Sequence, residues 1–148
     1  MKDIFPQTCV ALDLETTDLS PGRGDIIEVA AAKFKGDKVI AEFQHLTKPS
    51  SKIPIIVTAI TSITDDQVAE APPFADVKND LIKFVGKYPI VGHNINFDLN
   101  FLAGKGVEFT NSRYDTWKLA TLLAPELSSH SLEILTNFLK IKHVESHR

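Results

Sequence analysis

Residues 8–16 alternate between apolar and polar side chains with a period of two. Leu12 and Leu14 point to one side of this segment, whereas Asp13 and Glu15 point to the other. A period of two is typical of a β-strand, because successive side chains leave the backbone on opposite faces. The segment therefore predicts a strand with one face in the core and two carboxylates, about 7 Å apart, on the opposite face.

The rest of the chain predicts an α/β domain with a mixed sheet. Two further strands, at 25–34 and 39–46, are joined by a short turn and complete an antiparallel meander with the first. Apolar residues then recur with helical spacing. Helices are expected from a capping box at 64–67, over 74–85, from 96 to 104 or 106, over 115–123 and over 131–139, with one more strand at 88–92.

The composition is that of one ordinary domain. The chain has 148 residues, of which 43% are hydrophobic, and this is enough for a single core. Its richest apolar stretch, 53–57, indicates a loop or the start of a helix and is far shorter than the roughly 20 residues that cross a bilayer. The first residues lack the features of a signal peptide, and the single cysteine, Cys9, cannot form an internal disulfide. We therefore expect a cytoplasmic protein with no membrane partner.

The net charge of −3 argues against a protein that coats nucleic acid by positive charge alone. It does not argue against a nuclease, because carboxylates that bind divalent cations lower the formal charge and the bound ions restore it. Charge therefore leaves the function open.

Asp13 and Glu15 are the central chemical feature. Two carboxylates on one face of an otherwise apolar strand repel each other and resist the loss of water. A hard divalent cation, Mg²⁺ or Mn²⁺, resolves that conflict because it prefers oxygen ligands. The alternative is an edge strand whose polar face simply meets water, and the pair by itself leaves that alternative open.

Asp98 and His147 are candidates to join this pair. Asp98 follows the strand that ends at Gly92 and lies in the first turn of the next helix, a frequent place for ligand chemistry in α/β proteins. The helix dipole alone also favours an aspartate there. A histidine is the natural base near neutral pH, although His147 is equally consistent with a terminal surface residue. His93 is expected to orient the turn before Asp98.

Three motifs and one connecting segment occur in a characteristic order. They are Leu12-Asp13-Leu14-Glu15-Thr16-Thr17, Ile60-Thr61-Ser62-Ile63-Thr64-Asp65, Gly92-His93-Asn94-Ile95-Asn96-Phe97-Asp98 and Ser146-His147-Arg148. In order and spacing they resemble the motifs of the DnaQ-like exonucleases, whose DEDDh group is named for four acidic residues and a histidine. The resemblance covers Val10 to Arg148. It implies a ribonuclease-H-like fold, with a mixed sheet, three N-terminal antiparallel strands and helices on both faces.

The resemblance also implies an activity. The family's 3′–5′ exonucleases hydrolyse phosphodiester bonds of DNA or RNA and release nucleoside monophosphates, in proofreading, repair or nucleic-acid processing. Their two-metal scheme, with ions about 4 Å apart at the attacking and leaving oxygens, implies two Mg²⁺ or Mn²⁺ ions here. Asp13 is expected to bridge both ions, Glu15 and Asp98 to bind metal, and His147 to act as the general base.

Nucleotide-binding residues and partners follow from the same resemblance. Thr16 and Thr17 are expected to hold the terminal nucleotide, Ile63 to supply a wedge beside its base, and Asn94 to support the turn. The expected partners are a single strand or a 3′ end of nucleic acid, and a polymerase or helicase as a fused domain or separate protein. The alternative is a catalytically impaired nuclease-fold module that binds nucleic acid or such a partner.

Three positions depart from the family's pattern. Asp18 and Ser62 stand where the family usually has glycine, and an aspartate tolerates a left-handed conformation better than most residues. The family's last aspartate follows the histidine by about five residues, whereas only Arg148 follows His147 here. We therefore expect residues 1–148 to be a single exonuclease domain, truncated at its C-terminus within the last motif, that binds metal weakly and hydrolyses nucleic acid poorly.

Overall fold

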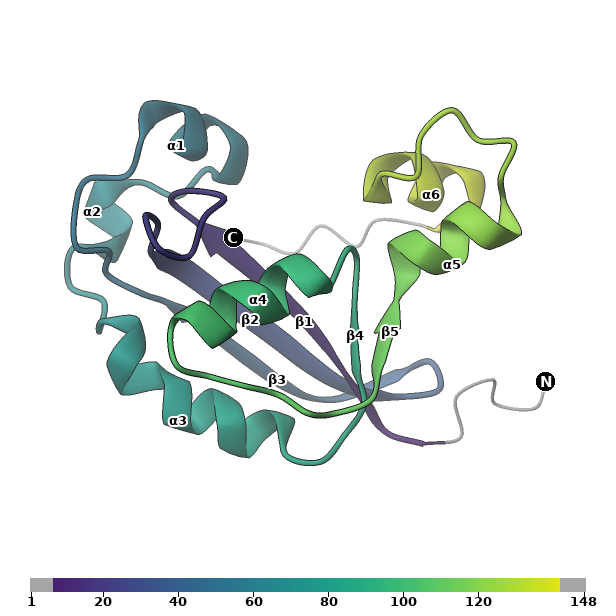
Figure 1. Ribbon diagram of the computed structural model, residues 1–148, viewed down its shortest axis with the longest axis horizontal. Coiled ribbons are helices and arrows are strands. Elements are labelled where there is room, and N and C mark those ends of the chain that lie inside the picture. The colour runs from purple at the N-terminus through teal and green to yellow at the C-terminus, as the bar shows by residue number, and fades with distance from the viewer. Residues whose placement is uncertain (1–6, 142–148) are drawn as a thin grey trace.

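A computed structural model describes residues 7–141 of the chain. A mixed five-stranded sheet lies at its centre with helices packed around it (Figure 1). The strands are β1 (Cys9–Thr16), β2 (Ile26–Lys35), β3 (Lys38–Leu46), β4 (Ile90–Gly92) and β5 (Arg113–Asp115). The helices are α1 (Ile55–Thr61), α2 (Asp65–Val68), α3 (Phe74–Val85), α4 (Asn96–Gly104), α5 (Thr116–Leu123) and α6 (Leu132–Phe138).

The strands lie in the order β3-β2-β1-β4-β5. β1, β2 and β3 pair antiparallel, whereas β4 pairs parallel to β1 and β5 pairs parallel to β4. The predicted mixed sheet and its antiparallel meander are therefore confirmed. β1 is an inner strand between β2 and β4, so the acidic pair does not lie on an edge strand.

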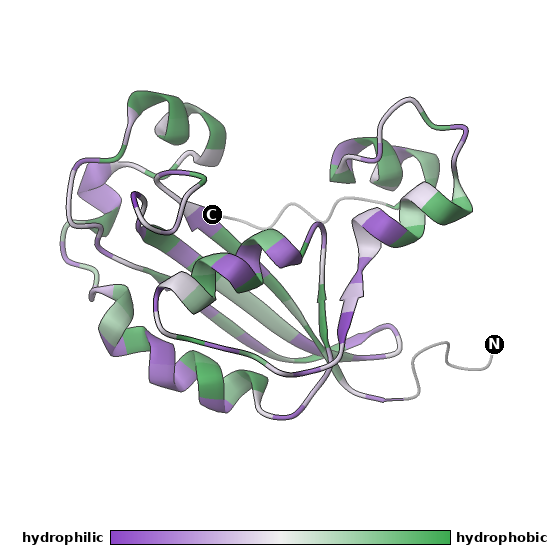
Figure 2. Ribbon diagram, viewed as in Figure 1, coloured by the Kyte–Doolittle hydropathy of each residue, from purple (hydrophilic) through white to green (hydrophobic). Residues whose placement is uncertain are grey.

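α3 and α4 cover the face of the sheet to which Leu12 and Leu14 point (Figure 1). Both leucines are buried, and α3 packs against them through its predicted apolar stripe, including Val77 and Leu81. Apolar and polar stretches alternate around α3 in Figure 2, as expected for a helix with one face in the core. This layer is the main core of the described residues.

The opposite face of the sheet has a floor of small residues. Ala11, Ala30 and Ala32 lie at the base of a hollow of about 490 Å³ that reaches Asp13. Thr116 of α5 and Leu132 of α6 line its margin, so helices lie on both sides of the sheet. Within residues 7–141, no helix combines the length and apolar character needed to cross a membrane.

Two elements show where local sequence patterns were sufficient and where they were not. The capping box that begins α2 is present: Thr64 N donates to Gln67 Oε1 at 2.8 Å, and Gln67 N donates to Thr64 Oγ1 at 3.4 Å. β5 was not predicted. Its three residues, Arg113–Asp115, have no alternating pattern, and they form a strand because they pair with β4.

Candidate active site

Asp13 and Glu15 lie toward the C-terminal end of β1. Leu12 and Leu14 are only 4% and 6% exposed, whereas Asp13 is exposed and Glu15 is half-buried. The predicted alternation is therefore present. The register of β1 against β2 shifts between Glu15 and Thr16, and such irregularities redirect a strand at its end.

Asp98 lies in the first turn of α4 and is only 4% exposed. Its Oδ1 accepts a hydrogen bond of 3.0 Å from the backbone N–H of Leu14. Because Leu14 stands between Asp13 and Glu15 in β1, this bond holds Asp98 beside both. The three carboxyl groups, two from β1 and one from α4, therefore belong to one cluster, which we call the acidic cluster.

The electrostatics of Asp98 reflect this placement. Burial raises its pKa to about 7, and the negative charges of Asp13 and, more weakly, Glu15 act in the same direction. Hydrogen bonds from backbone N–H groups oppose the rise but are outweighed. A proton or a cation at this point therefore relieves a real electrostatic conflict.

The chemistry of the donor set fits a hard divalent cation. Carboxylate oxygens are the ligands that Mg²⁺ and Mn²⁺ prefer, and a cation stabilises the ionised form of Asp98 that burial disfavours. Within residues 7–141, however, no group of three His, Cys, Asp or Glu side chains is arranged to hold a metal ion. The acidic cluster thus matches the expected cation in donor type and charge, but it is not a complete coordination shell by itself.

The two threonines after Glu15 build the loop at residues 17–25, which we call the β1–β2 loop. Thr16 Oγ1 donates to the carbonyl oxygen of Asp18 at 2.8 Å. Thr17 Oγ1 accepts from Asp25 N at 2.8 Å, and Thr17 N donates to Asp25 O at 2.9 Å. Both hydroxyl groups therefore shape the wall next to Glu15.

The φ angle of Asp18 is not positive, so this residue does not adopt a left-handed conformation. Its carboxylate accepts from Arg23 Nη2 at 3.1 Å and from Ser20 N at 2.8 Å. These hydrogen bonds, that of Arg23 foremost, hold the pKa of Asp18 below its usual value. The side chain thus stabilises the turn through these two hydrogen bonds.

A hollow of about 510 Å³ opens beside the acidic cluster, and we call it the terminal hollow. The β1–β2 loop forms one of its walls through Leu19 and Arg23, and α1 forms another through Ile56 and Ile60. Glu15 and Phe97 also line it. Its apolar walls beside a carboxylate have the character of a site for a base and sugar next to a phosphate.

The predicted wedge residue lies elsewhere. Ile63 is only 4% exposed and packs in a second core cluster with Ile53 and Val68. Ile60, by contrast, is 76% exposed and lines the terminal hollow. Ser62, between them, has φ 63° and ends α1 in the left-handed conformation, which explains why a glycine would be favoured there.

The turn before α4 contains the other predicted residues. Asn94 has φ 58°, and its N–H donates to Asp115 Oδ1 at 3.0 Å. His93 Nδ1 lies 3.0 Å from Thr116 Oγ1, which in turn donates to the carbonyl oxygen of Gly92 at 3.2 Å. Both residues therefore connect the turn to the start of α5. The predicted general base, His147, lies outside the described residues.

Asp115 is a supporting residue that sequence reasoning missed. It is 8% exposed, and its Oδ1 also accepts from the backbone N–H groups of Trp117 and Lys118 at 3.0 and 3.4 Å. An aspartate directly before an apolar helical run is a common N-cap, and that signal was available in the sequence.

Comparisons with known proteins identify the family and the fold of this chain. A family model described as "Exonuclease" matches residues 10–148. The chain is 36% identical over 152 residues to the DNA polymerase III PolC-type of Oceanobacillus iheyensis, covering 99% of this chain and 11% of that protein. It is 35% identical over 148 residues to the protein of the same name from Bacillus subtilis, covering 96% and 10%. The chain therefore spans about a tenth of the length of these curated relatives.

Solved structures show the same fold. Exonuclease X, in complex with a 5′ overhanging duplex DNA, matches with a TM-score of 0.76 and 29% identity, over 92% of this chain and 75% of that one. A product-bound exonuclease I matches with a TM-score of 0.78 and 23% identity, over 95% and 40%, which speaks for the fold alone. The resemblance to DnaQ-like exonucleases is thereby confirmed, and the chain belongs to the exonuclease family.

Proposed function

We propose that this chain is a 3′–5′ exonuclease domain that removes nucleotides from DNA with the help of two divalent cations, Mg²⁺ or Mn²⁺. The observation that carries the proposal is the buried Asp98, which is held by the Leu14 N–H between two other carboxylates. DNA is the proposed substrate because the relatives are named DNA polymerases and exonuclease X is bound to DNA.

In this proposal Asp13, Glu15 and Asp98 would hold the cations, which when bound would lower the pKa of water and offset the negative charge that develops on the phosphate oxygens. The Leu14 N–H fixes the direction of the Asp98 carboxylate. The terminal hollow takes the last nucleoside, with the exposed side chain of Ile60 against its base.

The reaction in this proposal is the hydrolysis of the last phosphodiester bond. The oxygen of water forms a bond to the last phosphorus atom, and the bond from that phosphorus to the 3′ oxygen of the preceding nucleotide breaks. A nucleoside 5′-monophosphate leaves, and the departing 3′ oxygen takes a proton from solvent, so the shortened strand ends in a 3′ hydroxyl group. His147, as predicted from the family motif, takes the proton from water.

We further propose that the domain acts inside a much longer polypeptide with a polymerase function, in the cytoplasm. Relatives that match almost the whole chain are about ten times longer than the chain and bear a polymerase name. Removal of misincorporated nucleotides is the role that suits an exonuclease in such a protein.

The test uses the full-length protein and a single strand labelled at its 5′ end. With Mn²⁺ the labelled products should shorten progressively from the 3′ end, and a chelator should stop the reaction. Asp13→Ala should abolish shortening while circular dichroism shows an unchanged fold. Near wild-type rates in Asp13→Ala, or rates unaffected by the chelator, would contradict the proposal.

A second candidate is a nuclease-fold module that binds nucleic acid without cleaving it. It is favoured by the incomplete coordination shell among residues 7–141. Tight binding of the labelled strand with no metal-dependent cleavage by the full-length protein would select it. The same assay on residues 1–148 alone tests the prediction that this chain hydrolyses poorly, which full activity would contradict.

A further inference from the structure

The terminal hollow is formed by segments that are distant in the sequence. Leu19 and Arg23 come from the β1–β2 loop, whereas Ile56 and Ile60 come from α1. Loops and short helices of this kind do not hold a fixed separation by themselves, because their backbone entropy favours many arrangements. Contacts between the segments that carry the two walls therefore contribute to the distance between them.

Asp25 supplies such a contact at the end of the β1–β2 loop. Its Oδ2 accepts from Ser50 N at 2.8 Å and from Ser50 Oγ at 2.5 Å. Its Oδ1 accepts from Lys105 Nζ at 3.1 Å, in an ion pair whose side chains are 28% and 24% exposed. One carboxylate thus joins three segments.

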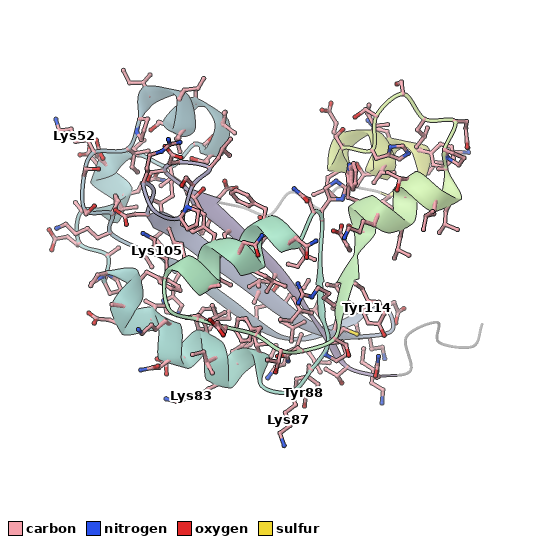
Figure 3. All side chains as sticks on the ribbon, in the orientation of Figure 1. Lys52, Lys83, Lys87, Tyr88, Lys105 and Tyr114 are labelled. Carbon is pink, nitrogen blue, oxygen red and sulfur yellow. The ribbon has the colours of Figure 1, made fainter. Side chains whose placement is uncertain are left out.

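Each of these three segments is continuous in sequence with an element that forms the proposed site. Ser50 precedes α1, which begins at Ile55. Lys105 follows the last residue of α4, the helix that carries Asp98 in its first turn, and Figure 3 labels its side chain there. Asp25 itself closes the β1–β2 loop through its backbone bonds with Thr17.

The electrostatics support a permanently charged contact. Partial burial works to raise the pKa of Asp25, but the hydrogen bonds from Ser50 and the Lys105 ammonium outweigh it and hold the pKa below its usual value. The loop also packs directly on the end of α4, since a Cβ atom on Gly104 would lie 2.5 Å from Pro21 Cβ. The loop and α4 are therefore in close contact at two places.

We infer that Asp25 is a positioning residue for the 3′-terminal nucleotide, because its bonds to Ser50 and Lys105 set the width of the terminal hollow. The inference rests on the proposed function and adds to it a residue that touches neither cation nor scissile phosphate. Without the carboxylate, the substrate itself must order the walls when it binds. The conformational entropy lost in that ordering weakens substrate binding. Substrate capture should therefore suffer more than the chemical step.

The experiment measures KM and kcat of the full-length protein on a 3′-ended single strand. Asp25→Asn should raise KM about tenfold, the effect of losing one charge-assisted hydrogen bond, and change kcat less than threefold. Lys105→Gln should raise KM in the same direction, and the double variant should add little to either single variant. The matched control is Asp80→Asn, which removes the carboxylate of the exposed ion pair with Lys83 on α3 and should leave both constants unchanged.

Ser50→Ala keeps the backbone donor and removes only the hydroxyl group, so it tests the same contact if Asp25→Asn does not fold. It should give a smaller rise in KM. An unchanged KM in the folded variants, or a fall in kcat alone, would overturn the inference. If Asp13→Ala retains cleavage, the proposed function fails instead; if wild-type cleavage depends on Asp13 but KM ignores Asp25, only this inference fails.

Discussion

Two units of the molecule have the same architecture and use it differently. In β4–α4 and in β5–α5 a short parallel strand leads into a helix, and each unit places a buried aspartate near the junction, Asp98 or Asp115. Asp98 is surrounded by the charges of Asp13 and Glu15, and its pKa rises to about 7. Asp115 instead receives backbone N–H groups at Oδ1.

The helices that follow the two strands also differ in how many of their residues are buried. α4 buries Leu99, Phe101 and Leu102 along with Asp98, whereas α5 buries none of its residues. The aspartate beside two other carboxylates is thus carried on a helix fixed in the core, whereas the aspartate that caps α5 precedes a helix with no buried residue. The position at a strand–helix junction does not by itself decide the role; the neighbouring charges and donors do.

The largest expected effect is a fall in the cleavage rate when the charge of Asp98 is removed. Asp98→Asn keeps the acceptor for the Leu14 N–H but removes the charge that binds a cation in the proposed function. We expect the rate of cleavage by the full-length protein to fall roughly a thousandfold, since cation stabilisation of the transition state is worth several kcal/mol. The free energy of unfolding, measured with urea at pH 8, should not fall. A cleavage rate within tenfold of wild type would remove the distinction between the two aspartates.

A smaller effect is expected on the free energy of unfolding when the pH changes in the absence of metal. Between the ordinary pKa of 3.8 and about 7, folded Asp98 holds a proton that the unfolded chain releases, so stability falls as the pH rises through this window. From pH 5 up to the folded pKa of about 7 the expected loss is about 3 kcal/mol, because each pH unit contributes about 1.4 kcal/mol. Urea unfolding in a chelator should show wild type losing stability relative to Asp98→Asn between pH 5 and pH 8.

Added Mg²⁺ should restore wild-type stability at pH 8 and leave Asp98→Asn unchanged, because the cation stabilises the ionised carboxylate. A wild type whose stability follows that of Asp98→Asn at every pH would show that burial and neighbouring charge do not act on Asp98 as described.

The smallest effect is expected at Asp115. Asp115→Ala removes the N-cap of α5 and leaves the Asn94 N–H without its acceptor, so the free energy of unfolding should fall by about 2 kcal/mol. Cleavage measured well below the melting temperature should stay within tenfold of wild type. Asp115→Asn retains an acceptor oxygen and serves as the control, with little change in either quantity. Loss of cleavage in a fully folded Asp115→Ala protein would give both aspartates a chemical role and end the comparison.

Local sequence patterns predicted the parts of the fold and site that local physics determines. The alternation around Leu12 and Leu14 defined β1 and the shared face of the acidic pair, and the helical spacing after Pro73 defined α3. The inner position of β1 was not contained in that pattern, because strand order depends on pairing with β4, which lies far along the chain.

The parts that were missed depend on tertiary contacts or on a single backbone angle. β5 exists through its pairing with β4 rather than through any pattern in Arg113–Asp115. Ile63 enters the core because Ser62 turns the chain at φ 63°, which leaves Ile60 to line the terminal hollow. The contacts of Asp25 with Ser50 and Lys105 span 25 and 80 residues, beyond the reach of local spacing.

The hydrogen bond between Leu14 N and Asp98 Oδ1 has a consequence for which substitutions position 14 can tolerate. Its donor is a peptide N–H, which every amino acid except proline provides. Mutations that exchange one apolar residue for another at position 14 therefore change the packing of the core without removing the N–H group that holds Asp98. Homologous chains can therefore differ at position 14 and keep the same position of the Asp98 carboxylate, because a main-chain N–H group holds it.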